Sequence, residues 1–257
     1  MPDPRLARYW NVLARKNALE SILTATSNWD ANEFFATGRA HVARIMQEVE
    51  SRAPELRRTA ALDFGCGVGR VTVPFAAYFN KVVGVDIAPA MIAQARRMHA
   101  DQPQCRFVVN RGRHLRGFRS GEFDLVHATL VLQHIPPAFA RQNISELIRV
   151  TARTGVTVFQ MPEPIEPDAE ELFCEAPVVG SAMKRAIPRW IVRRWRAFKY
   201  FRIADRVPRM AMFGMLRADV VDTVENAGGR ILDVVEDRSH GTDVPGFLYI
   251  VQPIDAA

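Results

Sequence analysis

The chain of 257 residues has few cysteines and no long apolar run. Its three cysteines are scattered and form no Cys-x-x-Cys pair, which argues against a disulfide framework and a zinc site built on cysteine pairs. No stretch of 18 apolar residues occurs, so no transmembrane helix is predicted. The first residues, Met-Pro-Asp-Pro-Arg, lack the apolar centre of a secretion signal. These absences predict a cytoplasmic protein without a bound metal.

The composition is that of an ordinary globular protein. Hydrophobic residues make up 48% of the chain and charged residues 24%, and 257 residues are enough for one domain with a sizeable core. Strand and helix patterns alternate from residue 60 to 160, which predicts a parallel sheet covered by helices on both faces. Outside that region we expect helices at about 4–25, 39–52 and 217–227, a Pro-rich stretch at 162–180, a basic helical segment at 184–209, and strands at 231–236 and 246–252.

The most informative segment is residues 61–70, Ala-Leu-Asp-Phe-Gly-Cys-Gly-Val-Gly-Arg. A short apolar strand ends at Asp63–Phe64, and three alternating glycines then allow a tight turn against a ligand. A helix expected over 71–79 would present its first amides to an anionic group. The dinucleotide-binding pattern Gly-x-Gly-x-x-Gly requires glycine where this chain has Arg70, so a nicotinamide-dependent oxidoreductase is the disfavoured alternative. Cys66 is interpreted as a small packed residue.

A second strand, Val-Val-Gly-Val-Asp at 82–86, ends in an acid. Asp86 lies 17 residues after Gly69 and is placed to accept hydrogen bonds from both hydroxyls of a ribose. The alternative is that Asp86 caps a helix expected at Pro89–Met98. We favour the ribose contact because the strand, the acid and the spacing coincide.

Residues 123–137 read Phe-Asp-Leu-Val-His-Ala-Thr-Leu-Val-Leu-Gln-His-Ile-Pro-Pro, which predicts a fourth strand, a loop and a helix opened by prolines. With the glycine loop and Asp86, this run resembles the class I S-adenosylmethionine-dependent methyltransferases. The resemblance is close over about 58–162 and looser over 211–252. Residues 29–38 also look like the amino-terminal cover of a subset of small-molecule methyltransferases.

The resemblance implies a Rossmann-like fold, in which a mostly parallel, doubly wound sheet of seven strands carries helices on both faces. The last two strands are expected to form an antiparallel edge pair. One domain would span 1–257, divided into a helical cover (1–57), a cofactor-binding core (58–162), a basic helical insertion after the fifth strand (163–210), and a closing helix and strands (211–257).

The resemblance also implies that the cofactor is S-adenosylmethionine. Its methionine part would lie against the glycine loop and the end of the fourth strand, at Asp63, Gly65, Gly67, Gly69, Ala128 and Thr129. Asp86 would bind the ribose, and Ile87 would pack on the adenine. The family often has an acid after the third strand for the adenine amino group, whereas this chain has Arg111. Adenine recognition then falls to Asn110 or to backbone groups.

The predicted reaction is methyl transfer to a small or medium acceptor, at oxygen rather than nitrogen. An oxygen acceptor benefits from a general base, for which His134 is the first candidate and His240 the second. The alternative for His134 is that it orients the helix after Pro136, and His127 is interpreted as a buried, hydrogen-bonded histidine. A different reading of the whole chain is a catalytically silent cofactor-binding or partner-docking protein.

The basic segment at 184–209 holds ten Lys or Arg residues and a single acid, a net charge of +9 in a chain of +6. It could be a lid over the site, an anion-binding element for a charged acceptor, or a membrane-surface helix through 187–201 that would suit a glycan- or lipid-linked acceptor. A nucleic acid is disfavoured because the rest of the chain is acidic. No obligate protein partner is inferred.

Overall fold

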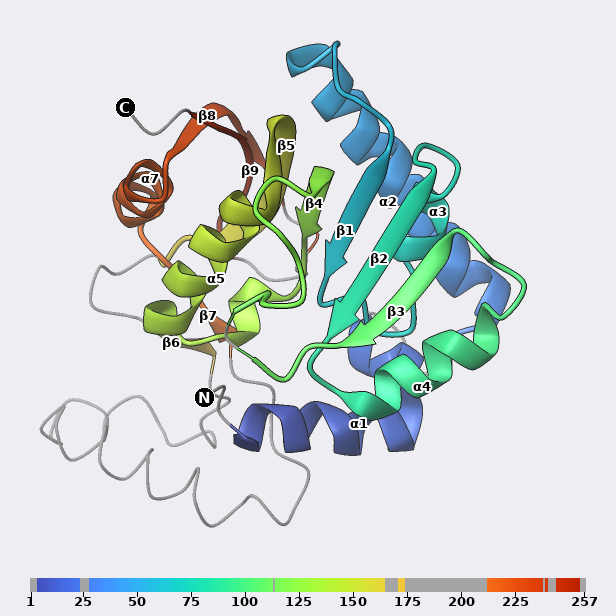
Figure 1. Ribbon diagram of the computed structural model, residues 1–257. Helices are drawn as coiled ribbons and strands as arrows, with labels where there is room; N and C mark the ends of the chain where they lie inside the picture. Colours follow the sequence, from blue (N-terminus) through green and yellow to red (C-terminus); the bar gives the residue numbers. More distant parts are fainter. Residues whose placement is uncertain are drawn as a thin grey trace, which may run out of the picture.

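The computed structural model describes residues 4–23, 28–112, 114–164, 171–173, 212–237, 239 and 244–254. Seven strands form one sheet in the order β3-β2-β1-β4-β5-β9-β8, and β6 and β7 form a separate pair (Figure 1). The order reverses between β1 and β4. A ligand of an open α/β sheet binds outside the carboxyl ends of the strands at such a switch point.

Five strands run parallel in the sheet: β1 (Ala60–Phe64), β2 (Lys81–Asp86), β3 (Cys105–Val109), β4 (Phe123–Ala128) and β5 (Thr151–Pro162). β9 (Gly246–Pro253) is antiparallel to β5 and to β8 (Gly229–Glu236). Every residue of β4 is buried, as expected for a central strand covered on both faces. The mostly parallel seven-stranded sheet and its antiparallel edge pair are confirmed.

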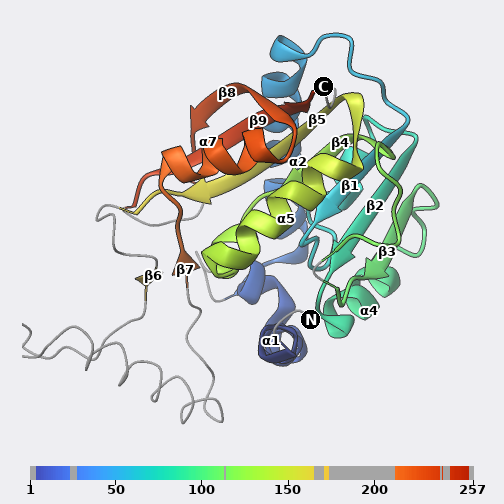
Figure 2. The same ribbon diagram turned by 60° about the vertical axis from the view of Figure 1, so that its left-hand side comes forward.

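Helices cover both faces of the sheet (Figure 2). On one face lie α2 (Ala31–Arg52), α3 (Thr72–Phe75) and α4 (Pro89–Met98), and on the other lie α5 (Pro137–Val150) and α7 (Arg217–Asn226). The core under α2 and α3 joins Val42 and Phe75 to Leu125 of β4. The core under α5 and α7 joins Ile144 and Val220 to the opposite side of the same strands.

The carboxyl ends of β1, β2 and β3 face α1 (Pro4–Ile22), which crosses below them in Figure 1. α1 is fixed to the start of α4, because the Ala90 amide donates to Asn11 Oδ1 at 2.8 Å. A 3-10 turn, η1 (Leu132–His134), lies between β4 and α5, and the short strands β6 (Glu171–Phe173) and β7 (Met212–Phe213) pair with one another. The carboxyl edge of the sheet is therefore the covered edge.

Two helices differ from the sequence prediction. The helix expected over 71–79 is α3, of only four residues, because the amides of Ala76, Ala77 and Tyr78 bond to carbonyls three residues back. The helix expected over 39–52 begins earlier, at Ala31, since the Asp30 carboxylate accepts hydrogen bonds from the amides of residues 32 and 33.

The helices within the described ranges include none that is both long and apolar enough to cross a bilayer. The basic segment at 184–209 and His240 lie outside the described residues. The predicted roles of that segment, and the division of the chain into four segments, stay predictions.

Candidate active site

The glycine loop follows β1 and turns under the carboxyl ends of the strands. Gly65, Gly67 and Gly69 all have left-handed backbone angles, with φ of +76°, +54° and +89°. A Cβ atom at Gly65 would lie 2.4 Å from the side chain of Val131, and one at Gly67 would lie 2.6 Å from Ile22. Side chains of the protein itself thus pack closely against the loop, and glycine is the residue that fits at these positions.

Asp86 ends β2 beside this loop, and both its carboxylate oxygens accept backbone hydrogen bonds. The Gly67 amide donates to Oδ2 at 3.0 Å, and the Ala88 amide donates to Oδ1 at 2.8 Å. Burial raises the pKa of Asp86 to about 6, although these hydrogen bonds act in the opposite direction. Asp86 does not cap α4, whose N-cap residue Ala88 has no side-chain cap. The acid predicted to hold a ribose is therefore tied to the loop predicted to hold the methionine part.

The other predicted cofactor residues lie at the same edge. The Asn110 amide donates to the carbonyl of Asp86 at 2.9 Å, and Asn110 Oδ1 accepts from the Gly112 amide at 3.3 Å. Ile87 is partly buried, whereas Arg111 is exposed. Their cofactor contacts stay predictions, as do those of Ala128 and Thr129, which are buried at the end of β4.

His134 is buried in η1 rather than open to solvent. Its ring packs edge-on against Trp10 of α1, with centroids 5.2 Å apart, and its Nε2 lies 3.3 Å from the side-chain nitrogen of Gln133. The buried Oε1 of Gln133 has no hydrogen-bond partner among the residues described. η1 and α1 thus close the site from the α5 side of the sheet.

A buried polar cluster lies on the opposite, α2 side, made of Asp63, Thr72, His127, Thr129 and His41. Asp63 faces His127 in the register of β1 and β4. Thr72 donates to Asp63 Oδ2 at 2.6 Å, and His127 Nδ1 lies 3.0 Å from Asp63 Oδ1. His41 Nε2 lies 3.1 Å from His127 Nε2, and Thr129 Oγ1 lies 3.2 Å from His41 Nε2 and 3.1 Å from His127 Nε2. Both oxygens of Asp63 are therefore engaged within the protein.

Arg70 lies next to this cluster, where the sequence departs from the dinucleotide-binding pattern. It is only 6% exposed, and its guanidinium donates to Thr37 Oγ1 at 3.3 Å. Burial lowers the pKa of Arg70, while the negative charge of Asp63 raises it. A Cβ atom at Gly38 of α2 would lie 2.0 Å from the Arg70 carbonyl oxygen, so only glycine allows the helix to approach the loop this closely.

Further polar side chains meet beyond β4 and β5. The Leu130 amide donates to Gln160 Oε1 at 3.1 Å, and Gln160 Nε2 donates to Ser239 Oγ at 3.1 Å. Leu130 has a φ of +58°, which is strained for a leucine. Arg44 of α2 pairs with the buried Asp237 at 2.9 Å. Burial raises the pKa of Asp237, but hydrogen bonds from Ser239 and Arg44 outweigh it and hold the pKa below its usual value.

Known proteins with a similar sequence or fold indicate the family to which this glycine loop and sheet are related. Residues 61–155 match the family described as "Methyltransferase domain". Among similar curated proteins are a trans-aconitate 2-methyltransferase of Enterobacter sp. (strain 638), 32% identical over 120 residues, and one of Variovorax paradoxus (strain S110), 34% identical over 134 residues. The matches cover 44% and 51% of this chain and 43% and 49% of those proteins. Over residues 61–155 the chain belongs to the class I S-adenosylmethionine-dependent methyltransferases.

The chain thus spans about half the length of these curated methyltransferases. Solved methyltransferases share the fold over a longer range. The magnesium protoporphyrin IX methyltransferase of Synechocystis PCC 6803, with bound S-adenosylhomocysteine, has a TM-score of 0.61 at 15% identity, covering 96% of this chain and 97% of that one. A Leishmania major S-adenosylmethionine-dependent methyltransferase has a TM-score of 0.65 at 12% identity, covering 97% and 82%. The expected cofactor is confirmed at the level of the family.

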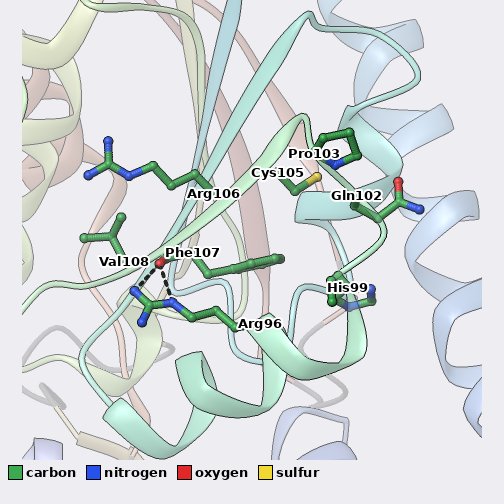
Figure 3. A pocket seen from close by; sticks show the side chains of 9 residues that line it. Arg96, His99, Gln102, Pro103, Cys105, Arg106, Phe107 and Val108 are labelled. Atoms are coloured by element: carbon green, nitrogen blue, oxygen red, sulfur yellow. Dashed lines mark hydrogen bonds between the residues drawn. The ribbon is translucent and has the colours of Figure 1, made fainter.

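No trio of His, Cys, Asp or Glu side chains suited to a metal occurs in the described ranges of this methyltransferase domain and its flanking segments. A hollow beside the edge strand β3 is lined by residues of α4 and β3, among them His99 and Phe107 (Figure 3). Arg96 donates two hydrogen bonds to the Phe107 carbonyl there. None of the predicted site residues lines this hollow, although His99 Nε2 lies 2.9 Å from the Val68 carbonyl of the glycine loop.

Four polar residues of the site, His41, Arg44, Gln160 and Ser239, were not predicted from the sequence. No motif marks them, because they lie on three segments, α2, β5 and the loop after β8, that only the tertiary fold brings together. The sequence held one signal: His127 on β4 and Thr129 just after it are two residues apart in extended chain, so their side chains point to the same side. That side is the one covered by α2, which carries His41.

Proposed function

We propose that this protein transfers a methyl group from S-adenosylmethionine to an oxygen atom of a small acceptor. The observation that carries the proposal is the contact between Asp86 and the glycine loop at the switch point of the sheet. The loop offers backbone without side chains, and Asp86 offers carboxylate oxygens one strand away. A methionine carboxylate and a ribose diol require those two kinds of group.

The residues of the chain fit the cofactor. Gly65, Gly67 and Gly69 have backbone angles that favour glycine, and an added Cβ atom at each would collide with a neighbouring side chain, so this loop would hold a ligand through main-chain groups. Asp86 would accept hydrogen bonds from the ribose hydroxyls, and Ile87 and Asn110 would flank the adenine. When bound, S-adenosylmethionine supplies a sulfonium methyl carbon, and the protein aligns the acceptor with it and excludes water.

A small acceptor is supported by the relatives named trans-aconitate 2-methyltransferase. Their matches cover only part of this chain. An acceptor would lie over the ends of β4 and β5, where Thr129, Gln160 and Ser239 present hydroxyl and amide groups. His134 stays a candidate base on the opposite side. Glycan- or lipid-linked acceptors depend on the segment at 184–209, outside the described residues.

Titration calorimetry with S-adenosylhomocysteine tests cofactor binding directly. We expect a dissociation constant in the micromolar range for the wild-type protein and a loss of at least about tenfold for Asp86→Asn, because one of two acceptor oxygens becomes a donor. Asp101→Asn is the matched control, since Asp101 is an exposed acid on the loop before β3. No binding by the wild-type protein, or equal binding by both variants, would contradict the cofactor site. Tight binding of NADH would favour an oxidoreductase.

Methyl transfer itself is tested with tritium-labelled S-adenosylmethionine and the small molecules of a cell extract, with trans-aconitate as a separate arm. We expect one labelled product whose methyl group is on oxygen, identified by mass spectrometry. A protein that binds S-adenosylhomocysteine but labels nothing in either arm would be the silent cofactor-binding protein. Transfer to nitrogen would contradict the oxygen acceptor.

A further inference from the structure

We infer that His41 is the general base that takes a proton from the methyl acceptor, whose nucleophilic atom carries that proton. His127 and Asp63 lie behind His41 and hold the proton after it is taken. The inference rests on the proposed function and specifies its acceptor: a hydroxyl group rather than a carboxylate. It assigns a catalytic role to a histidine of α2, while the roles of His134 and His240 stay predictions. His127 and Asp63 are positioning residues in this scheme.

The hydrogen bonds of the buried polar cluster fix which nitrogen carries each proton. Asp63 Oδ1 is a carboxylate oxygen and only accepts, so His127 Nδ1, 3.0 Å away, carries a hydrogen. A neutral His127 then has a lone pair on Nε2. We assign the donor role to His41 Nε2, which faces that lone pair at 3.1 Å and lies 3.2 Å from Thr129 Oγ1, so a neutral His41 has its own lone pair on Nδ1.

His41 occupies the right place for this role. Its Nε2 contacts His127 of β4 and Thr129 just after it, at the switch point where ligands of open α/β sheets bind. Its side chain keeps partial exposure, whereas His127 is 1% exposed and carries the ring of Phe75 against its edge. His41 Nδ1 forms no hydrogen bond with any residue that the structure describes. We therefore assign the role of base to Nδ1 of the partly exposed His41, and the buried His127 lies behind it.

The surrounding charges keep His41 neutral at the start. Burial, the neighbouring His127, and the positive charges of Arg70 from the glycine loop and Arg44 from its own helix all lower the pKa of His41 well below its usual value. Arg44 is itself paired with Asp237, and Asp63 contacts the cluster only through His127 and Thr72. His41 therefore does not retain a proton. The negative charge of Asp63 favours transfer of that proton from His41 to His127.

The proton balance is simple. The acceptor O–H gives its proton to His41 Nδ1 while an oxygen electron pair forms the bond to the methyl carbon, and the pair of the broken carbon–sulfur bond stays on sulfur. His41 passes the proton on its Nε2 to His127 Nε2, which leaves His127 as an imidazolium beside the Asp63 carboxylate. Proton release to water by the reverse route restores the cluster.

This arrangement distinguishes acceptor classes. A carboxylic acid is already ionised at neutral pH and has no proton to lose, so a base would be idle. A hydroxyl group keeps its proton at neutral pH and gains most from one. The cluster therefore predicts a hydroxyl acceptor.

Nuclear magnetic resonance of histidine-labelled protein, with and without S-adenosylhomocysteine, tests the relay without any acceptor. We expect neutral His41 protonated on Nε2 and neutral His127 protonated on Nδ1, with His41 remaining neutral below pH 6.5, the usual pKa of histidine. His41→Gln and His127→Asn assign the two signals, and His114→Gln is the control because its side chain is 51% exposed beside Glu146. A His41 protonated on Nδ1, or positively charged at neutral pH, would overturn the relay even if cofactor binding is normal.

The pH profile of methyl transfer to the small molecules of a cell extract is the second measurement. We expect a flat wild-type rate above neutral pH and a loss of about 100-fold or more in His41→Gln, whose rate then rises with pH as the hydroxyl ionises by itself. Binding of S-adenosylhomocysteine should stay within about twofold. Wild-type rates in His41→Gln at every pH, or a product methylated on a carboxylate, would refute the inference. Without any product, the nuclear magnetic resonance result decides alone.

Discussion

Replacing Asp86 by asparagine should remove a pH dependence from the stability of the cofactor-free protein while weakening cofactor binding. Burial raises the pKa of Asp86 from 3.8 to about 6 in the folded chain. Between these values the folded state binds more protons than the unfolded state, so the free energy of unfolding falls as pH rises. The stabilisation by this group is complete below the unfolded pKa and is lost once the pH passes about 6.

The size of the effect follows from the difference between the two pKa values. Each pH unit corresponds to about 1.4 kcal/mol, so ionising Asp86 costs the fold at most about 3 kcal/mol at neutral pH. The side chain keeps some contact with water, which makes this an upper limit. Asparagine has no charge to desolvate, but it gives the amides of Gly67 and Ala88 one acceptor oxygen instead of two, a cost of about 1–3 kcal/mol that does not depend on pH.

Urea unfolding at several pH values on both sides of 6 measures the effect. The difference in stability between wild type and Asp86→Asn should shift in favour of the variant as the pH rises, by up to about 3 kcal/mol. The same samples should show weaker S-adenosylhomocysteine binding by the variant, and Asp101→Asn should follow the wild type in both assays. Parallel pH curves for wild type and Asp86→Asn would refute the reasoning, because they would mean that the Asp86 pKa is the same in the folded and unfolded chain.

Three further predictions concern packing and charge. Gly38→Ala should lower stability by about 1–3 kcal/mol and weaken S-adenosylhomocysteine binding, since its Cβ would lie 2.0 Å from the Arg70 carbonyl oxygen; unchanged urea unfolding and calorimetry would contradict this. Arg44→Ala should cost about 1–2 kcal/mol, because it leaves the buried Asp237 without its cation. That cost should shrink as acid protonates Asp237, whose pKa is lowered, and a pH-independent cost would argue against the pairing. Cys66 should resist alkylation in the folded protein, because burial raises the pKa of its thiol, and mass spectrometry should find it modified only after unfolding.

The sequence was sufficient for the parts of the site that local rules determine. Alternating glycines after an apolar strand predict left-handed turns, and all three have positive φ. An acid at the end of the next strand has to lie beside them, because neighbouring parallel strands end at one edge of the sheet. Asp86 accordingly bonds to Gly67.

The sequence was insufficient where side chains from distant segments meet. The cofactor contact of Asp63 stays a prediction, whereas its hydrogen bonds with Thr72 and His127 were not predicted, because they depend on how α3 and β4 pack beside β1. Asp124 was noted only as part of a family motif. In the structure its carboxylate accepts the amides of Thr59 and Ala60, which fixes the start of β1. Neither contact has a signature in the spacing of the chain.

The position of α2 limits how this protein can be cut or recombined. The family match begins at residue 61, yet Val42, Ile45 and Val49 of α2 are wholly buried against the sheet. An excised segment of matched residues would lack α2, so it would expose to water the apolar sheet residues that α2 covers and would lose the helix that packs on the glycine loop. A chimera carrying this segment would need residues 31–52 from the same parent, and their omission should produce insoluble material.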